Sequence, residues 1–208
     1  MGLLDVLTGR RKLAKPAEDR LFAISTAYVT FQTAYSITSR GNAAIVFQSL
    51  NTADFTAIVT DMEEVVRATA ADSQITVQTH EDSYGYSWLV LQDGSGNART
   101  ADAGSPVETA PEGDFDGLVV GINGVSGAIE SGGYGERLLC AVFAFADDRD
   151  RPLYWIYNYK RGTFYPFVPT GEHERDNERE LVLRAQVGRE LPVEAELQRW
   201  FPLWGIPL

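Results

Sequence analysis

The side chains that most often carry catalysis are few and far apart in this sequence. Its two histidines, His80 and His173, lie in different halves of the 208-residue chain, and Cys140 is the single cysteine. No motif of a zinc hydrolase, a serine hydrolase or a phosphate-binding loop occurs. Cys140 lies in the apolar run 138–146, where a thiol packs as a small hydrophobic group. We therefore expect no enzyme activity, no catalytic residue, no metal site and no cofactor.

A candidate binding surface is more evident, in the block 157–166. This block holds the highest local density of aromatic and cationic side chains in a chain that is otherwise acidic. Tyrosine and arginine are enriched at the centres of protein interfaces, so the block predicts a partner-binding edge. The pattern is equally typical of a strand that ends at a Gly162 turn, with its rings packed inward and its cations paired with carboxylates. The candidate residues are Tyr157, Tyr159, Lys160, Arg161, Phe164 and Tyr165.

A second aromatic group follows near the end of the sequence. Trp200, Phe201 and Trp204 lie close together, and Pro202 interrupts them. Two interpretations stay open: the rings pack the end of the chain onto the core, or they form a partner-facing patch. We therefore add Trp200 and Trp204 to the candidate partner-binding residues.

The first sixteen residues form a candidate membrane or partner contact. Leu3, Leu4 and Leu7 would share one face of a helix, and basic residues follow directly. An apolar anchor beside a basic cluster predicts weak, reversible attachment to anionic lipid at the inner face of the membrane. Docking of this segment on its own domain or in a partner's groove, and simple fraying, stay open as alternatives. The basic residues are Arg10, Arg11, Lys12 and Lys15.

The composition favours a cytoplasmic protein that does not bind nucleic acid. A chain of this length with 44% hydrophobic residues can bury a substantial core. The formal net charge of -11 repels polyphosphate, which argues against DNA or RNA as a partner. The single cysteine excludes an intrachain disulfide, and the apolar run near the start is shorter than a signal sequence or a membrane span. We expect a soluble protein in a reducing compartment.

Apolar spacing predicts the elements that must position these candidates. In the first half, the turn-like stretch 39–42 lies between two β-rich runs and predicts a hairpin. The stretch 92–113 lacks large aromatic residues and is dense in Gly, Ala, Asp and Glu, so we expect a mobile surface connection there. The expected elements of this half are strands at 27–33, 43–50, 74–79 and 84–91 and an amphipathic helix over 52–71.

The second half is expected to supply a glycine-containing helix, a hairpin and a final amphipathic helix. Gly117, Gly121, Gly124 and Ala128 flank the apolar stripe of the first helix. Each glycine lowers intrinsic helix stability by about 1 kcal/mol, so another element should approach this face closely. The charged stretch 147–151 predicts a hairpin turn. The expected elements are helices over 114–131, 174–190 and 193–201 and strands at 138–146, 153–159 and 163–168.

These elements together predict an α+β fold in which antiparallel β-hairpins are covered by amphipathic helices. We expect one domain over 17–208, built from two packed halves, with 1–16 as an appendage. The order of helices and strand pairs resembles the layout of secretion-chaperone-like folds, which bind segments of their partners. This analogy concerns layout alone.

Several short stretches carry a resemblance to a known family over nearly the whole chain. They are 1–5, 82–88, 134–135 with 137–140, 157–166, 175–177 and 199–204. Together they resemble the PspA-associated proteins of the PspAB type. The resemblance implies a part in a phage-shock-like response to envelope stress. It also implies, as partner, a PspA-like membrane-remodelling protein or an associated membrane protease, and it carries no catalytic residue to this chain.

Three hypotheses of function follow from the sequence. The first is a non-catalytic adaptor or regulatory binding protein of a membrane-stress response. The second is a small-ligand-binding protein or enzyme with a pocket beside the helix over 114–131. The third is a chaperone-like holder of an extended partner segment.

Overall fold

The computed structural model describes residues 20–50, 56–57, 59–60, 75–82, 84–94 and 113–208. The predicted appendage 1–16 lies outside the described residues, as does nearly all of the predicted surface connection 92–113. The predicted helix over 52–71 is described only at 56–57 and 59–60, and these four residues are helical.

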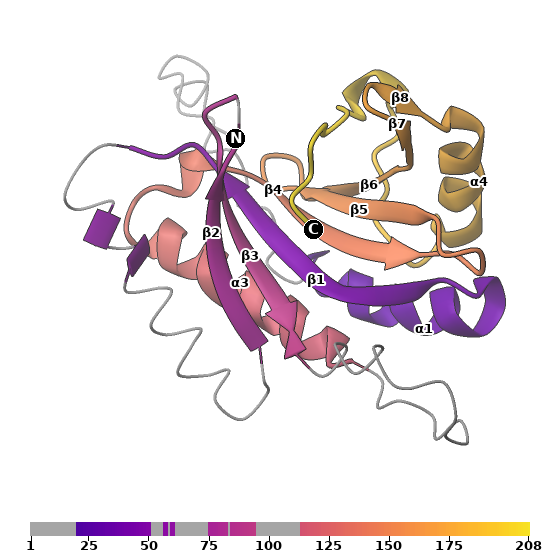
Figure 1. The fold of residues 1–208 in the computed structure, drawn as a ribbon, viewed down its shortest axis with the longest axis horizontal. Helices are drawn as coiled ribbons and strands as arrows, with labels where there is room; N and C mark the ends of the chain where they lie inside the picture. Colours follow the sequence, from indigo (N-terminus) through magenta and orange to yellow (C-terminus); the bar gives the residue numbers. More distant parts are fainter. Residues whose placement is uncertain (1–19, 51–55, 58, 61–74, 83, 95–112) are drawn as a thin grey trace, which may run out of the picture.

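A six-stranded antiparallel sheet lies at the centre of the structure (Figure 1). Its strand order is β2-β3-β1-β4-β5-β6, so strands from both halves of the chain pair at the β1 and β4 boundary. A two-stranded hairpin, three α-helices and the 3₁₀ turns Gly135–Arg137 and Leu197–Arg199 accompany it among the described elements, and the fold is α+β as predicted. The elements are α1 Ala23–Tyr35, β1 Thr38–Phe47, β2 Ile75–Glu81, β3 Ser87–Asp93, α3 Phe115–Ser131, β4 Leu138–Ala146, β5 Pro152–Asn158, β6 Thr163–Phe167, β7 Pro169–Gly171, β8 Glu174–Arg175 and α4 Asn177–Val187.

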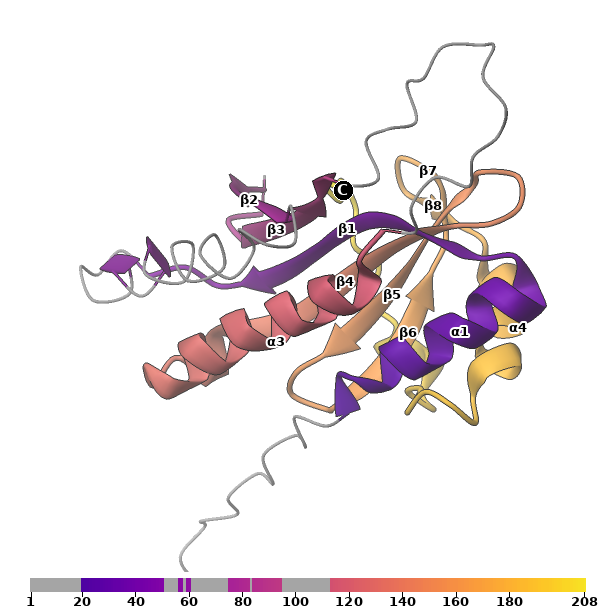
Figure 2. The same cartoon turned by 90° about the horizontal axis from the view of Figure 1, so that it is seen from below.

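Helices α1 and α3 cover one face of the sheet, as Figure 2 shows. Their apolar stripes meet the strand residues of that face in one buried cluster. Phe31 of α1 is fully buried, and its ring lies against Trp155 of β5 and Phe145 of β4. Phe115 at the start of α3 reaches the same Phe145 ring. Burial of this aromatic layer fixes both helices to the sheet.

The predicted strand at 27–33 is wrong, because these residues form the middle of α1. Ile24, Ala27 and Phe31 are the buried residues of this helix, and their steps of three and four place them on one side. Of the strand-favouring residues between them, Tyr28 packs at the edge of this stripe against Phe115, and Val29 is exposed. Tertiary packing of the apolar stripe therefore outweighs their strand propensity.

The predicted hairpin turn at 39–42 is also wrong, since these residues continue strand β1. Gly41 has a positive φ of 72°, and the register of β1 against β4 shifts between Ser39 and Ala43. The Ser39 hydroxyl accepts a hydrogen bond from the Gly41 amide at 3.0 Å. These turn-forming residues make a β-bulge within the strand. A short sequence pattern does not distinguish a glycine in a bulge from a glycine in a hairpin turn.

Two predictions near the end of the chain need adjustment. The predicted helix 174–190 is the shorter α4, because Asp176 caps its start by accepting a hydrogen bond from the Arg179 amide. The two residues before Asp176 form β8 instead. The predicted helix over 193–201 is wrong, since only the single 3₁₀ turn Leu197–Arg199 forms there.

The predicted hairpin turn over 147–151 is confirmed by the antiparallel pairing of β4 with β5.

Gly121 shows the close approach that was expected at the glycine-containing helix. A Cβ atom added at Gly121 would lie 2.5 Å from Leu91 Cδ2, and Leu91 is fully buried in β3. We expect Gly121→Ala to destabilise the protein by about 1 kcal/mol, because the overpacking of about 1–3 kcal/mol exceeds the gain in helix propensity. Chemical denaturation of the two proteins measures this difference.

Gly124, one turn further along α3, provides the matched control. It is exposed, and an added Cβ would meet no atom within 4 Å. Gly124→Ala should therefore stabilise the protein by up to about 1 kcal/mol through helix propensity alone. Equal stabilisation by both substitutions would contradict the close contact between α3 and Leu91.

Within the described ranges, no helix is long and apolar enough to cross a membrane.

Candidate binding groove

The second face of the sheet carries an apolar cluster that none of the described helices covers (Figures 1 and 2). Alternate strand residues such as Ala44, Val46 and Trp88 point to this side, because successive side chains of a strand face opposite ways. The segment from Trp200 onward lies over part of this cluster, and Figure 1 shows it in yellow passing in front of the strands. The remaining part of the face is hollowed.

This hollow is a groove of about 410 Å³, open to solvent and lined mainly by apolar side chains. Strands β1, β3 and β4 form its floor, and the turn between β2 and β3, the turn between β5 and β6, and the segment after Trp200 form its walls. The lining residues are Val46, Asp82, Tyr84, Tyr86, Trp88, Leu139, Cys140, Asn158, Lys160, Tyr165, Phe201, Pro202, Leu203 and Trp204. All except Val46 come from four of the stretches that carry the family resemblance.

Asp82 organises the wall between β2 and β3. Its Oδ1 accepts hydrogen bonds from the amides of Tyr84 and Tyr86, and its Oδ2 accepts one from Trp88 Nε1, all at 2.9 Å. Gly85 supplies the positive φ of 80° that the turn needs. One carboxylate thus fixes the turn, sets the Trp88 ring in the groove floor and leaves both of its oxygens occupied.

The turn between β5 and β6 presents Lys160 to the groove. Asn158 Oδ1 accepts the Lys160 amide at 3.1 Å, and the Asn158 carbonyl accepts the Gly162 amide at 2.8 Å. Gly162 has a φ of 65°, which explains the glycine at this position. The tight turn holds the lysine backbone while its side chain stays exposed.

The third wall is tied down at its start. Arg175 donates a hydrogen bond to the Trp200 carbonyl at 2.8 Å, and the Tyr165 hydroxyl donates one to the Phe201 carbonyl at 3.0 Å. Beyond these two points, residues 202–208 make no hydrogen bond within the part of the chain that the structure describes. The Trp204 ring instead packs against Phe167 at 5.3 Å.

Exposed aromatic rings gather at the rim of the groove. Tyr84, Tyr86 and Phe201 retain 62%, 39% and 58% of their surface exposed. Large rings with this exposure are enriched at protein interfaces, where they add contact area at low entropic cost. The rim therefore extends the apolar surface beyond the hollow itself.

The predicted partner-binding block divides between the two faces of the sheet. Lys160 and Tyr165 line the groove, as does Trp204 from the second aromatic group. Tyr157, Tyr159 and Phe164 are buried on the helix side. A contiguous block on paired strands cannot form one surface, because its side chains alternate between faces.

Arg161 and Trp200 have structural partners. Arg161 Nε donates to Glu194 Oε2 at 2.5 Å, and Trp200 Nε1 donates to the Glu194 carbonyl at 3.1 Å. Burial raises the pKa of the Glu194 carboxyl, but hydrogen bonds from the Glu196 amide and Arg161 outweigh it and hold the pKa below its usual value. Arg161 thus stabilises a buried carboxylate, and Lys160 is the cation of this block that faces the groove.

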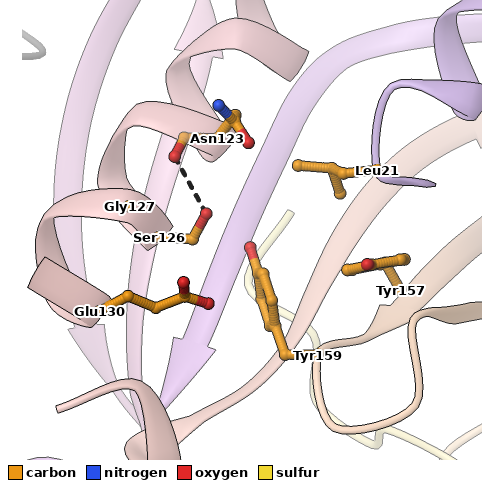
Figure 3. Close-up of a pocket in the computed structure, with 7 residues that line it drawn as sticks. All are labelled: Leu21, Asn123, Ser126, Gly127, Glu130, Tyr157 and Tyr159. Carbon is orange, nitrogen blue, oxygen red and sulfur yellow. Dashed lines mark hydrogen bonds between the residues drawn. The ribbon is translucent and has the colours of Figure 1, made fainter. Parts of the chain in front are cut away.

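A second, smaller cavity lies beside α3, where a ligand pocket was predicted as an alternative (Figure 3). Figure 3 shows the Tyr159 hydroxyl pointing toward Ser126, with Glu130 at one side. Its volume of about 70 Å³ has room for only a few water molecules. Small-molecule sites in proteins usually enclose roughly 300–1,000 Å³, so the groove, and not this cavity, has the capacity of a ligand site.

The polar groups of the groove are few. Burial raises the pKa of the Cys140 thiol to about 12, so the thiol stays protonated near neutral pH. Burial also raises the pKa of the Tyr165 hydroxyl well above its usual value. Among the described residues, no cluster of three or more His, Cys, Asp or Glu side chains is arranged to hold a metal ion. The groove offers apolar surface, aromatic rings, the Lys160 ammonium group, the Asp82 carboxylate and the Asn158 side chain.

Sequence reasoning missed most of the groove. Tyr84, Tyr86, Trp88 and Phe201 were not among the candidate site residues, although they supply its rim and floor. The run from Asp82 to Gly85 carries a usable signal, because Asp two residues before an aromatic and three before Gly is typical of a side-chain-capped turn. The proximity of this turn to Lys160 depends on sheet order and has no local signal.

Comparisons with known proteins give one match. A family model described as PspAB, PspA associated protein B, matches residues 1–208. No curated protein and no solved structure matches the chain.

Proposed function

Because the chain belongs to the PspA associated protein B family, we propose that it is a non-catalytic adaptor that binds a PspA-related protein. The groove on the second face of the sheet is the binding site, and it receives an apolar segment of that protein. The acidic charge and the single cysteine favour the cytoplasm as the compartment of this encounter.

The groove is the observation that carries the proposal. Its floor is apolar, its rim holds three exposed rings, and no helix among the described residues covers it. Monomeric proteins seldom leave such a surface without a partner. The floor carries little charge, and burial raises the pKa of its thiol, which supports binding over catalysis by this thiol.

Removal of two rim rings tests the proposal. We expect Tyr84→Ala combined with Phe201→Ala to weaken binding of purified PspA at least tenfold, because aromatic side chains that a partner covers are enriched among the residues whose truncation costs more than about 1 kcal/mol of binding free energy. Isothermal titration calorimetry measures the dissociation constant. Both side chains are largely exposed, so the thermal midpoint should change little.

The matched control removes two exposed apolar side chains on the helix side. Val29 of α1 and Val120 of α3 are 59% and 54% exposed. Val29→Ala with Val120→Ala should leave PspA binding unchanged. If PspA binds the rim variant and the control variant equally tightly, or binds neither these nor the unmodified chain, the groove is not the PspA site.

A further inference from the structure

Lys160 is the one lysine in residues 17–208 of this acidic chain. Its ammonium group has no ion-pair or hydrogen-bond partner within the described ranges, although its backbone amide is bonded to Asn158. Neighbouring arginines differ in this respect: Arg161 pairs with Glu194, and Arg175 pairs with Glu180. The groove is therefore flanked by a cation with no counter-ion of its own in the described chain.

Asp82, the acid of the groove, forms no ion pair with Lys160 in the described chain. Both oxygens of Asp82 are engaged by three hydrogen bonds that build the opposite wall. When an occupant covers the groove, it removes water from the Lys160 side chain. An ammonium group that loses part of its water without gaining an anion is destabilised, so an uncharged or basic occupant would bind less tightly than an acidic one.

We infer that the segment held in the groove carries an Asp or Glu carboxylate beside its apolar side chains, and that Lys160 pairs with this carboxylate. The inference rests on the proposed function and adds the chemistry of the bound segment. Lys160 then selects among apolar segments, since a basic residue at the same position would be repelled.

A fatty acid also combines an apolar chain with a carboxylate, but the rim favours a protein segment. Small ligands are usually enclosed over most of their surface, whereas this groove is open and its rings at Tyr84 and Phe201 stay more than half exposed. A ligand that only fills the hollow leaves these rings in water. A partner broader than the hollow covers them as well.

The test joins the full chain to purified PspA with a water-soluble carbodiimide. This reagent adds to a carboxylate and activates it. An amine in direct contact then attacks the activated carboxyl carbon, an amide forms, and the reagent leaves as a urea. We expect mass spectrometry to find Lys160 joined to an Asp or Glu of PspA that is flanked by apolar residues. Lys160→Arg should abolish the cross-link and keep the affinity, because a guanidinium group preserves the ion pair but does not form this amide.

Charge reversal completes the test. Lys160→Glu should weaken PspA binding about tenfold at low salt, and the difference should shrink as salt screens the charges. If Lys160→Glu binds as tightly as the unmodified chain while the rim variant has lost binding, the groove is the site and the carboxylate inference is wrong. If the rim variant also binds normally, the proposed function itself fails. Oleate that displaces PspA and binds one to one through Lys160 would also overturn the protein-segment assignment.

Discussion

Replacement of Phe31 by alanine should lower the free energy of unfolding by about 3–5 kcal/mol. The Phe31 side chain is fully buried, stacks on Trp155 at 5.7 Å and meets the edge of Phe145 at 5.5 Å. Its loss leaves a cavity between α1 and the sheet that two large, fixed rings cannot fill. Equilibrium unfolding in urea, followed by tryptophan fluorescence, measures the change.

Substitution of the nearby residue Val29 is the control that distinguishes loss of the Phe31 contacts from a general destabilisation of α1. Val29 lies on the same helix and is 59% exposed, so Val29→Ala should change stability by no more than about 0.5 kcal/mol. A strand at this position would place Val29 and Phe31 on one face and make both substitutions costly. Comparable losses for the two variants would therefore contradict the helix.

The same segment shows where sequence reasoning reaches its limit. The steps from Ile24 to Phe31 fit a helix, but the intervening Tyr28, Val29 and Thr30 favour a strand, and local pattern does not decide between them. The choice depends on the aromatic rings of β4 and β5, which lie more than a hundred residues away. Longer and more regular stripes, such as that of α3, contain enough apolar positions to be predicted from the sequence alone.

The candidate site shows a related limit. Predictions of chemistry were local: Lys160, Tyr165 and Trp204 were selected by residue type, and all three line the groove. Tyr157 and Phe164 are aromatic residues of the same block, but they are buried on the helix side of the sheet. Successive side chains of a strand point to opposite faces, so residue type alone does not predict which of them line the groove. The turn at Asp82 joins the site only through the pairing of β3 beside β1, which the sequence does not reveal.

The second large expected effect is the loss of stability when the buried ion pair between Arg175 and Glu180, beside the groove, is broken. Arg175 and Glu180 retain only 15% and 2% of their side-chain surface, and Arg175 Nη2 lies 2.7 Å from Glu180 Oε2. Glu180 Oε1 also accepts the Val168 amide at 2.9 Å, while Arg175 donates to the Trp200 carbonyl. The pair thus connects α4, the end of β6 and the start of the third groove wall.

We expect Glu180→Ala to destabilise the protein by about 3–5 kcal/mol, because it leaves a buried guanidinium group without its carboxylate and a buried amide without an acceptor. Glu178→Ala, an exposed change in the same first turn of α4, should cost about 1 kcal/mol or less. Glu180→Gln should fall between them, since an amide oxygen can still accept the Val168 hydrogen bond. Urea unfolding of the three variants gives the order.

Glu180 accepts hydrogen bonds from the Arg175 guanidinium group, which in turn donates one to the Trp200 carbonyl. We therefore expect the Glu180→Gln variant, which keeps part of its stability, to loosen the third groove wall as well. Trypsin cleaves after arginine, and Arg199 lies directly before this anchor point. We expect faster native-state cleavage after Arg199 in Glu180→Gln than in the unmodified chain, and weaker PspA binding in parallel. Cleavage at the same rate in both proteins, with the stability loss confirmed, would show that packing of Trp200 and Trp204 holds the wall without the ion pair.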